Sequence, residues 1–198
     1  MKSASLMALA LMLAAPAADA QVPPVRVRGT VQSFDGQTLA LATPADGVVT
    51  LALTDTTGVN GLEAKTAADI TDGVFIGTTA VKNACGRWQA REVHIFPESM
   101  RGAGEGHYAW DLPESTMTNA AVTGTASTGD GRTLQLRYAD GTVEVDVTRQ
   151  TAIVALTLGD RSLLVPGATV FALAAPQEGG VANAVAIIAE TNGVKPPM

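Results

Sequence analysis

The sequence predicts an all-β protein that contains two copies of one small domain. Three observations support this prediction: a long internal repeat, short runs of β-branched residues with period-two alternation, and Asp-Gly pairs between the runs. The strand signals recur in the same order in both halves. The two copies are therefore expected to share one fold.

The chain begins with the features of an export signal. Lys2 is followed by an apolar run over residues 6–13 and by Ala18-Asp19-Ala20, which has the A-x-A form of a cleavage site. We expect residues 1–20 to be removed after Ala20 and the mature protein to be periplasmic or secreted. No later apolar run reaches 18 residues, so no integral membrane segment is expected after signal removal.

The repeat extends through both halves of the mature chain. Residues 28–41 recur as residues 123–136, an offset of 95 (123 − 28). The last strand of each copy carries an Ala-x-x-Val-x-Ile pattern: Ala90, Val93 and Ile95 in the first copy, and Ala182, Val185 and Ile187 in the second, an offset of 92 (182 − 90). The predicted domains are residues 25–96 and 120–190.

Each copy is expected to hold about five strands. Residues 143–147 alternate Val with Glu or Asp, as in a half-buried strand. Asp35-Gly36 and Asp130-Gly131 predict two-residue hairpin turns of type I′, which require positive φ. Residues 62–70 predict a short helix or turn, and their counterpart, residues 156–164, is less helical in composition.

This order of elements resembles a widespread family of secreted bacterial OB-like β-barrel domains with no established activity. The order is a strand, an Asp-Gly turn, two strands, an intervening segment, a strand led by Gly73 or Gly167, and the final Ala-x-x-Val-x-Ile strand. The resemblance covers residues 25–96 and 120–190. It implies two tandem OB-like, Greek-key barrels and an envelope location, and it implies no chemistry.

Charge and cysteine content narrow the partners. The net charge of −6 argues against nucleic acid, whose phosphates require clustered Lys and Arg. Cys85 is the only cysteine, so no disulfide can form within the chain. The C-terminal tail comprises residues 191–198; its last part, Lys195-Pro196-Pro197-Met198, and Pro23-Pro24 near the other end are expected to be extended or disordered.

The connector, residues 97–119, differs from a plain linker because it is rich in large side chains. Phe96, Tyr108, Trp110 and Leu112 should gain by leaving water, so the connector is expected to be ordered against the barrels. Trp88 is expected to be a half-buried anchor at the contact between the domains.

A metal site is one interpretation of this region. His94, Met100, His107 and Met117 combine the imidazole and thioether groups that favour copper, especially Cu(I). The alternation of Val93 and Ile95 into the core should turn His94 outward, towards the connector. In the other interpretation, the methionines fill gaps in the packing and His94 only ends a strand.

No catalytic pattern is recognisable. Ser115 lacks a G-x-S-x-G context, and no phosphate loop or dinucleotide fingerprint occurs. The sequence therefore favours an exported, non-catalytic binding protein, with copper as the preferred ligand. The alternative is a structural module that contacts another envelope protein or an oligosaccharide, without metal.

Overall fold

The computed structural model describes residues 24–129, 131–177 and 179–197. The expected export signal and its cleavage site lie outside these residues. The described chain is all-β, as predicted. None of its helices is long and apolar enough to cross a membrane.

The elements follow one another as short strands joined by turns. The strands are β1 (Val25–Phe34), β2 (Thr38–Thr43), β3 (Gly47–Ala64), β4 (Phe75–Lys82), β5 (Trp88–Ile95), β6 (Gly106–Ala109), β7 (Ser115–Thr128), β8 (Gly131–Tyr138), β9 (Gly141–Thr148), β10 (Ala152–Leu158), β11 (Thr169–Ala175) and β12 (Ala182–Ala189). Three single 3-10 turns, η1 (Ala67–Asp69), η2 (Glu98–Met100) and η3 (Arg161–Leu163), lie between them.

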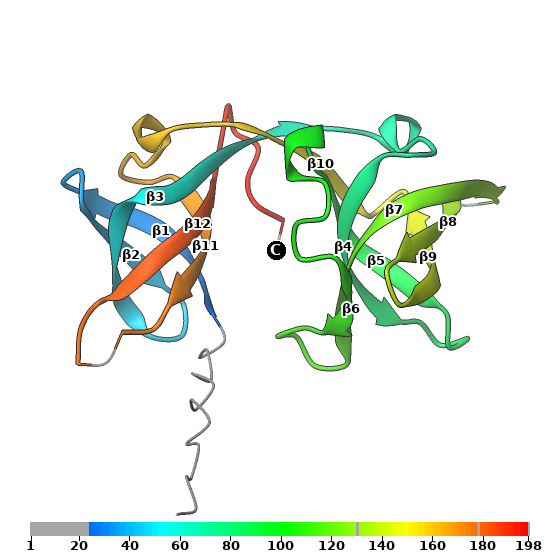
Figure 1. The fold of residues 1–198 in the computed structure, drawn as a ribbon, viewed down its shortest axis with the longest axis horizontal. Helices are drawn as coiled ribbons and strands as arrows, with labels where there is room; N and C mark the ends of the chain where they lie inside the picture. The colour runs from blue at the N-terminus through cyan, green and yellow to red at the C-terminus, as the bar shows by residue number, and fades with distance from the viewer. Residues whose placement is uncertain (1–23, 130, 178, 198) are drawn as a thin grey trace, which may run out of the picture.

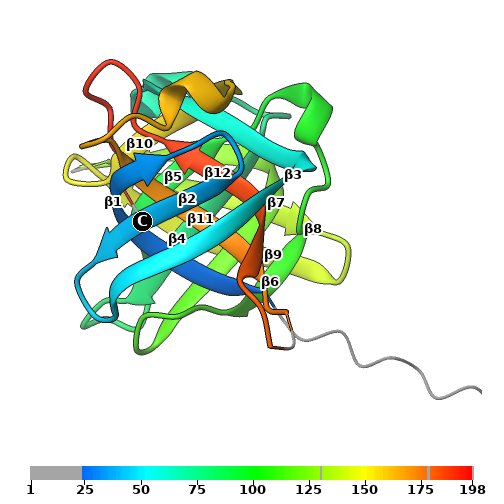
Figure 2. The ribbon, with the colours of Figure 1, turned by 90° about the vertical axis from the view of Figure 1, so that its left-hand side faces the viewer.

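The strands close two five-stranded barrels that lie side by side (Figure 1). Barrel A has the order β12-β11-β1-β2-β3 and is closed by a parallel pairing of β12 with β3. Barrel B has the order β5-β4-β7-β8-β9 and is closed by a parallel pairing of β5 with β9. Figure 2 looks onto barrel A from the side that lies on the left in Figure 1.

The pairing corrects the prediction that residues 25–96 and 120–190 each close a barrel. Barrel A combines the first three strands of the first copy with the last two strands of the second. Barrel B combines the last two strands of the first copy with the first three strands of the second. The copies therefore exchange their final strand pairs. As a result barrel B is continuous in sequence and barrel A is interrupted by it.

The long strand β3 explains the exchange. Its 18 residues span roughly 60 Å at about 3.3 Å per residue, more than a small barrel accommodates. The first part of β3 pairs with β2, and its last part, residues 60–64, pairs antiparallel with β10. This paired segment of β3 and β10, here called the bridge, passes from one barrel to the other (Figure 1). The chain therefore enters β4 beside the other barrel.

β-Bulges at equivalent places in the two barrels fix the residue offset between the two copies more accurately than the sequence repeat does. The pairing of β4 with β5 skips Arg91, and the pairing of β11 with β12 skips Val185, 94 positions later (185 − 91). On the first strands, Thr30 faces Thr169 and Ala121 faces Phe75, which gives an offset of 91 (121 − 30). The predicted offsets of 92 and 95 for these strands are corrected to 94 and 91. Shifts of two and four residues keep every side chain on its face, so alternation alone cannot distinguish them.

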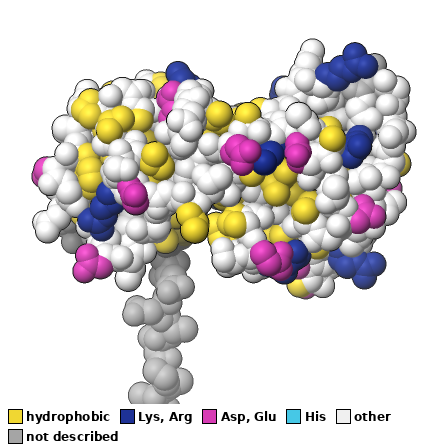
Figure 3. All heavy atoms as spheres, turned by 90° about the horizontal axis from the view of Figure 1, so that it is seen from above, with side chains coloured by type: hydrophobic (Ala, Val, Ile, Leu, Met, Phe, Trp, Pro, Cys, Tyr) yellow, Lys and Arg dark blue, Asp and Glu magenta, His cyan; other side chains and the backbone are white. Residues whose placement is uncertain are grey.

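Each barrel buries the apolar side chains that alternation assigned to its inside. Leu39, Leu41 and Leu51 are fully buried in barrel A. Ile76, Val93 and Leu134 are fully buried in barrel B. A third cluster, formed by Leu62, Val154 and Leu156 of the bridge, lies between the barrels with Phe96, Met100 and Ile188 against it. Figure 3 shows hydrophobic side chains gathered where the two lobes meet.

The turns occur where the sequence predicts them, but the type of the first hairpin turn differs from the prediction. Gly36 has a φ of 100°, but Asp35 has no positive φ and its carboxylate instead accepts hydrogen bonds from Gln37 N and Thr38 N. The first hairpin therefore has a loop of three residues, 35–37, and not a two-residue type I′ turn. Asp130 of the second hairpin lies outside the described residues. The segments predicted as a short helix or turn hold η1 and, at the counterpart, η3.

The C-terminal tail packs against the rest of the chain over residues 191–197, and residues 195–197 have no regular secondary structure. Thr191 and Val194 exchange two backbone hydrogen bonds of 3.1 and 2.9 Å. Val194 packs against the bridge and Pro196 is buried. The tail thus fills part of the space between the barrels (Figure 1).

A disulfide trap tests the strand exchange. With Cys85→Ser as background, the pair Thr30→Cys and Thr169→Cys should oxidise to a disulfide, because these residues face each other on β1 and β11. The control pair Ala121→Cys and Thr169→Cys should stay reduced, because Ala121 faces Phe75 in barrel B. Thiol counting and peptide mapping after mild oxidation give the result. A bond only in the control pair would mean that each copy closes its own barrel.

Candidate functional site

A cavity of about 290 Å³ lies between the two barrels. The outer face of barrel B and the connector form one side of it. The outer face of barrel A and the bridge form the other side. Its lining is mostly apolar and includes four aromatic rings, those of Phe96, Tyr108, Trp110 and Phe171.

Strand β5 places two polar side chains on the outer face of barrel B. Val93 points into the barrel core and is fully buried, so its neighbours on the strand point outward. These neighbours are Glu92 and His94, which are only 1% and 3% exposed because barrel A and the connector cover them. Outward-facing residues are thus buried at the contact between the barrels.

His94 lines the cavity with an unsatisfied ring nitrogen. Within the described chain its Nε2 atom is buried and has no hydrogen-bond partner. Its Nδ1 atom lies 3.9 Å from Oε1 of Glu92. Burial lowers the pKa of the His94 imidazole to about 4, so the ring is neutral at neutral pH. A neutral ring keeps one nitrogen lone pair free for a ligand.

Glu92 lies behind His94. Its Oε1 atom accepts a hydrogen bond of 2.7 Å from Thr79 Oγ1, while its Oε2 atom is buried with no partner among the described residues. Burial raises the pKa of the Glu92 carboxyl to about 7, against the opposing effects of Thr79 and the nearby Arg28. Glu92 is thus a carboxyl group that gains or loses its proton near neutral pH.

Asn119 supplies a second polar group to the cavity. Its Nδ2 atom donates a 3.1 Å hydrogen bond to the carbonyl oxygen of Ala103 in the connector. This bond identifies the remaining amide atom as oxygen, and this Oδ1 atom is buried without a partner in the described structure. Asn119 lines the cavity and therefore holds an unpaired buried acceptor beside it.

Gly77 separates the two unsatisfied groups. It faces Asn119 on β7 and His94 on β5, so the three residues form one row across the sheet. A Cβ atom on Gly77 would lie 2.7 Å from Asn119 Oδ1 and 2.9 Å from the ring of Phe96. Asn119 and Phe96 thus pack directly against the backbone of Gly77, and a larger residue at this position would displace them.

Barrel A has apolar residues at the matching positions of its last strands. The offset of 94 relates Glu92 to Ala186 and His94 to Ile188, and both of these line the opposite side of the same cavity. Gly77 corresponds to Phe171 by the same offset. The fold is therefore built equally well without a carboxyl or an imidazole at these positions. Some other requirement must account for Glu92 and His94.

The loop after β6 fastens barrel B to barrel A beside the cavity. Asp111 forms a bidentate ion pair with Arg28 of β1, with N–O distances of 2.5 and 3.2 Å. The guanidinium of Arg26 lies 3.6 Å from the centre of the Trp110 ring. Both contacts join the connector to the first strand of barrel A, so Trp110 is held at the cavity.

The structure brings together three of the four residues predicted to bind metal. His94, Met100 and Met117 all line the cavity. His107 does not, because on β6 it alternates with Tyr108 and points to the other side. There its Nδ1 atom lies 2.8 Å from Thr118 Oγ1, and its ring packs between those of Trp88 and Tyr138.

The connector is ordered, as predicted, although it hides only part of its large side chains. Phe96 and Trp110 are half-buried, whereas Tyr108 and Leu112 are 38% and 49% exposed. Trp88 packs on barrel B beside His107 and is not an anchor between the barrels. Within the described residues, no three His, Cys, Asp or Glu side chains gather to hold a metal.

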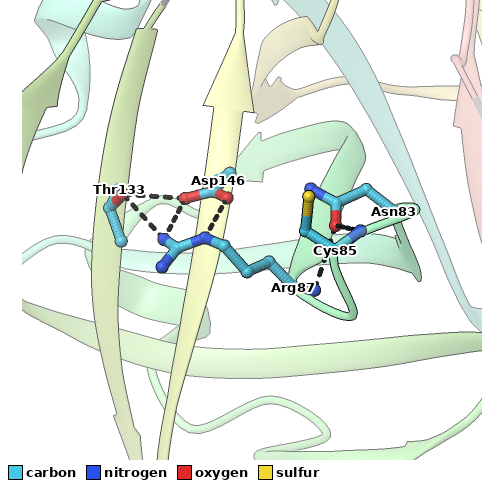
Figure 4. A network of polar contacts seen from close by, with 5 residues as sticks. All are labelled: Asn83, Cys85, Arg87, Thr133 and Asp146. Atoms are coloured by element: carbon cyan, nitrogen blue, oxygen red, sulfur yellow. Dashed lines mark hydrogen bonds and ion pairs between the residues drawn. The ribbon is translucent and has the colours of Figure 1, made fainter.

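Cys85 lies away from the cavity, in the exposed turn between β4 and β5 (Figure 4). The Asn83 side chain accepts hydrogen bonds from Cys85 N and Arg87 N and fixes this turn. Arg87 forms a bidentate ion pair with Asp146, which also accepts a hydrogen bond from Thr133. These partners satisfy one another, so the cluster has a structural role.

Glu92, Asn119 and Gly77 were not among the residues that the sequence predicted for a site. Glu92 could have been predicted from the sequence, because residues two positions apart on a strand point to the same face of the sheet, and Glu92 is two positions from His94. Asn119 and Gly77 could not have been predicted, since their role depends on which strands become neighbours.

The buried pair Glu92 and His94 predicts opposite pH effects on stability. The pKa of Glu92 is raised in the folded state, so its contribution to the free energy of unfolding is lost as pH rises from 4.5 through 7. The pKa of His94 is lowered, so its contribution is lost as pH falls from 6.5 through 4. Each effect amounts to about 3 kcal/mol at full extent.

Urea unfolding between pH 4 and pH 8 separates the two effects. Relative to the wild type, Glu92→Gln should gain stability as pH rises through this range, and His94→Ile should lose it. Parallel curves for the wild type and both variants would show that neither group titrates in the folded protein as described.

Comparison of the chain with protein-family models, curated proteins and solved structures finds no match.

Proposed function

We propose that the protein is a non-catalytic binding protein that takes a small, mainly apolar molecule into the cavity between its barrels. One observation carries the proposal: an apolar, aromatic cavity is lined by His94 and Asn119, and each of these side chains holds a buried polar atom without a partner among the described residues. An unsatisfied buried polar group costs about 1–3 kcal/mol. A ligand that satisfies both groups would remove this cost.

The character of the cavity supports an organic ligand. Small-molecule sites are concave, mostly apolar and lined by aromatic side chains, with a few polar groups that fix orientation. The cavity has this composition, and its volume of about 290 Å³ is near the lower end of the usual range. The apolar equivalents Ala186 and Ile188 indicate that the polar groups serve binding more than folding.

We further infer that the barrels are OB-like and that the protein acts in the bacterial envelope. In each barrel a fourth strand lies beside the first of three consecutive antiparallel strands, which is the Greek-key order. Five-stranded Greek-key barrels are the OB architecture. The envelope location rests on the export signal expected at residues 1–20.

A soft metal ion is the second candidate ligand. The specific observation in its favour is that the thioether-bearing Met100 and Met117 line the same cavity as the free Nε2 atom of His94. Thioether and imidazole ligands favour Cu(I). In a Cu(I) competition titration, this candidate requires binding that is lost in the variant Met100→Leu with Met117→Leu. Equal affinity in that variant would exclude a thioether site.

A cavity-filling substitution tests the organic-ligand proposal. Ala186→Leu should abolish binding of 2-aminonaphthalene, followed by its fluorescence, because the added atoms occupy the cavity that Ala186 lines. The fold should persist, with a change in stability below about 3 kcal/mol. Val185→Leu is the control, since Val185 is 51% exposed on the same strand and should bind as the wild type does. Binding that survives Ala186→Leu would place the site elsewhere.

A further inference from the structure

The residues that line the cavity share a property beyond their apolar character. Among those that the structure describes there is no Lys, Arg, Asp or Glu, and the His94 ring is neutral at neutral pH. We infer that the cavity takes an uncharged aromatic molecule and excludes anions and cations alike. This inference rests on the proposed function and names the class of ligand that the same cavity takes.

An ionised ligand would lose its hydration in this cavity without compensation. An ion that leaves water needs a countercharge and several hydrogen bonds to offset the loss of its hydration shell. The described walls supply aromatic rings, aliphatic side chains and the thioethers of Met100 and Met117, but no group that is ionised at neutral pH. A neutral ligand does not meet this cost.

An anion has no countercharge at the walls of the cavity. Arg28 already forms a bidentate ion pair, the guanidinium of Arg26 lies over the Trp110 ring, and neither arginine lines the cavity. The Glu92 carboxyl stands behind His94, with its Oε1 atom 3.9 Å from Nδ1 of the ring. When it is ionised, this carboxyl repels a second negative charge. Carboxylates and phosphates are therefore disfavoured.

A cation gains little from the aromatic rings of the cavity. Rings attract cations over their faces, but two of these four rings already have a guanidinium there. Arg26 lies 3.6 Å from the centre of the Trp110 ring, and Arg28 lies 5.0 Å from the centre of the Phe171 ring. The described lining also offers no carboxylate to offset the lost hydration of an ammonium group.

The walls favour an aromatic body over a saturated body of similar size. Phe171 belongs to barrel A, whereas Phe96, Tyr108 and Trp110 belong to barrel B and the connector. A ligand between the barrels therefore meets rings from both sides. Each ring pair is favoured by roughly two- to tenfold beyond the apolar area that it buries. The two thioethers of the lining also favour contacts with the edges of aromatic rings.

Three naphthalene compounds of nearly equal size and different charge test the inference. They are 2-acetylnaphthalene, which is neutral, 2-naphthoate, which is an anion, and naphthalene-2-carboxamidinium, which is a cation. Isothermal titration calorimetry of the full mature chain at neutral pH should give at least about tenfold tighter binding for the neutral ketone than for either ion. The saturated analogue 2-acetyldecalin should bind severalfold more weakly than 2-acetylnaphthalene.

A charge placed in the wall shows whether the lining causes the preference. Leu173→Lys introduces an ammonium group at a half-buried position that lines the cavity, where the alkyl stem of lysine can keep apolar contacts. The affinity for 2-naphthoate relative to the ketone should then rise by about tenfold. Val185→Lys is the matched control, because it adds the same charge at a position that is 51% exposed and lies outside the lining. In this control the relative affinity should stay as in the wild type.

The outcomes separate the two proposals. Binding of either ion, or of the saturated ketone, as tightly as 2-acetylnaphthalene overturns the inference and leaves the binding function standing. An unchanged relative affinity in Leu173→Lys, shown to be folded by circular dichroism, has the same meaning. If that variant does not fold, the wild-type series decides by itself. Absence of binding by every compound, 2-aminonaphthalene included, overturns the proposed function together with the inference.

Discussion

The bridge, which is the paired segment of β3 and β10, is the constraint on which the rest of the structure depends. Residues 60–64 and 154–158 pair antiparallel and carry the chain out of one barrel and into the other. Because each strand of the bridge continues towards a different barrel, the final strand pairs must be exchanged. The bridge also forms one wall of the cavity through Asn60 and Leu156. The same pair of strands therefore accounts for the exchange of strands between the barrels and for one wall of the cavity.

The exchange places two outer barrel faces against each other, and this contact changes what those faces require. In a single small barrel an outward-facing Glu92 or His94 would be solvated. Between the barrels both are almost fully buried, and the pKa of each shifts towards the neutral form. The ion pair of Arg28 with Asp111 and the stacking of Arg26 on Trp110 hold the faces together beside them. Burial of these polar groups thus follows from the arrangement of the barrels.

The internal repeat separates structural requirements from functional ones. Most positions that fill the cores are apolar in both barrels, as Val93 and Ile187 are at the offset of 94. The outer positions beside the cavity differ: barrel B has His94 with Glu92 behind it, and barrel A has Ile188 and Ala186. Polar groups in only one of two equivalent folds are expected when the two contribute unequally to one ligand site. This asymmetry is why the binding proposal rests on polar groups and not on cavity volume.

The sequence by itself determined the strands, the repeat, the barrel interiors and the outward direction of His94, because alternation along a strand is a local property. It also identified three residues that line the cavity, namely His94, Met100 and Met117. Only the tertiary structure decided which strands are neighbours, because exchanged and unexchanged copies bury the same residues in equivalent barrels. The same holds for the register of the repeat, since shifts of two or four residues preserve alternation. The roles of Asn119 and Gly77, and the placing of His107 outside the cavity, follow from those pairings, and local sequence carries no information about them.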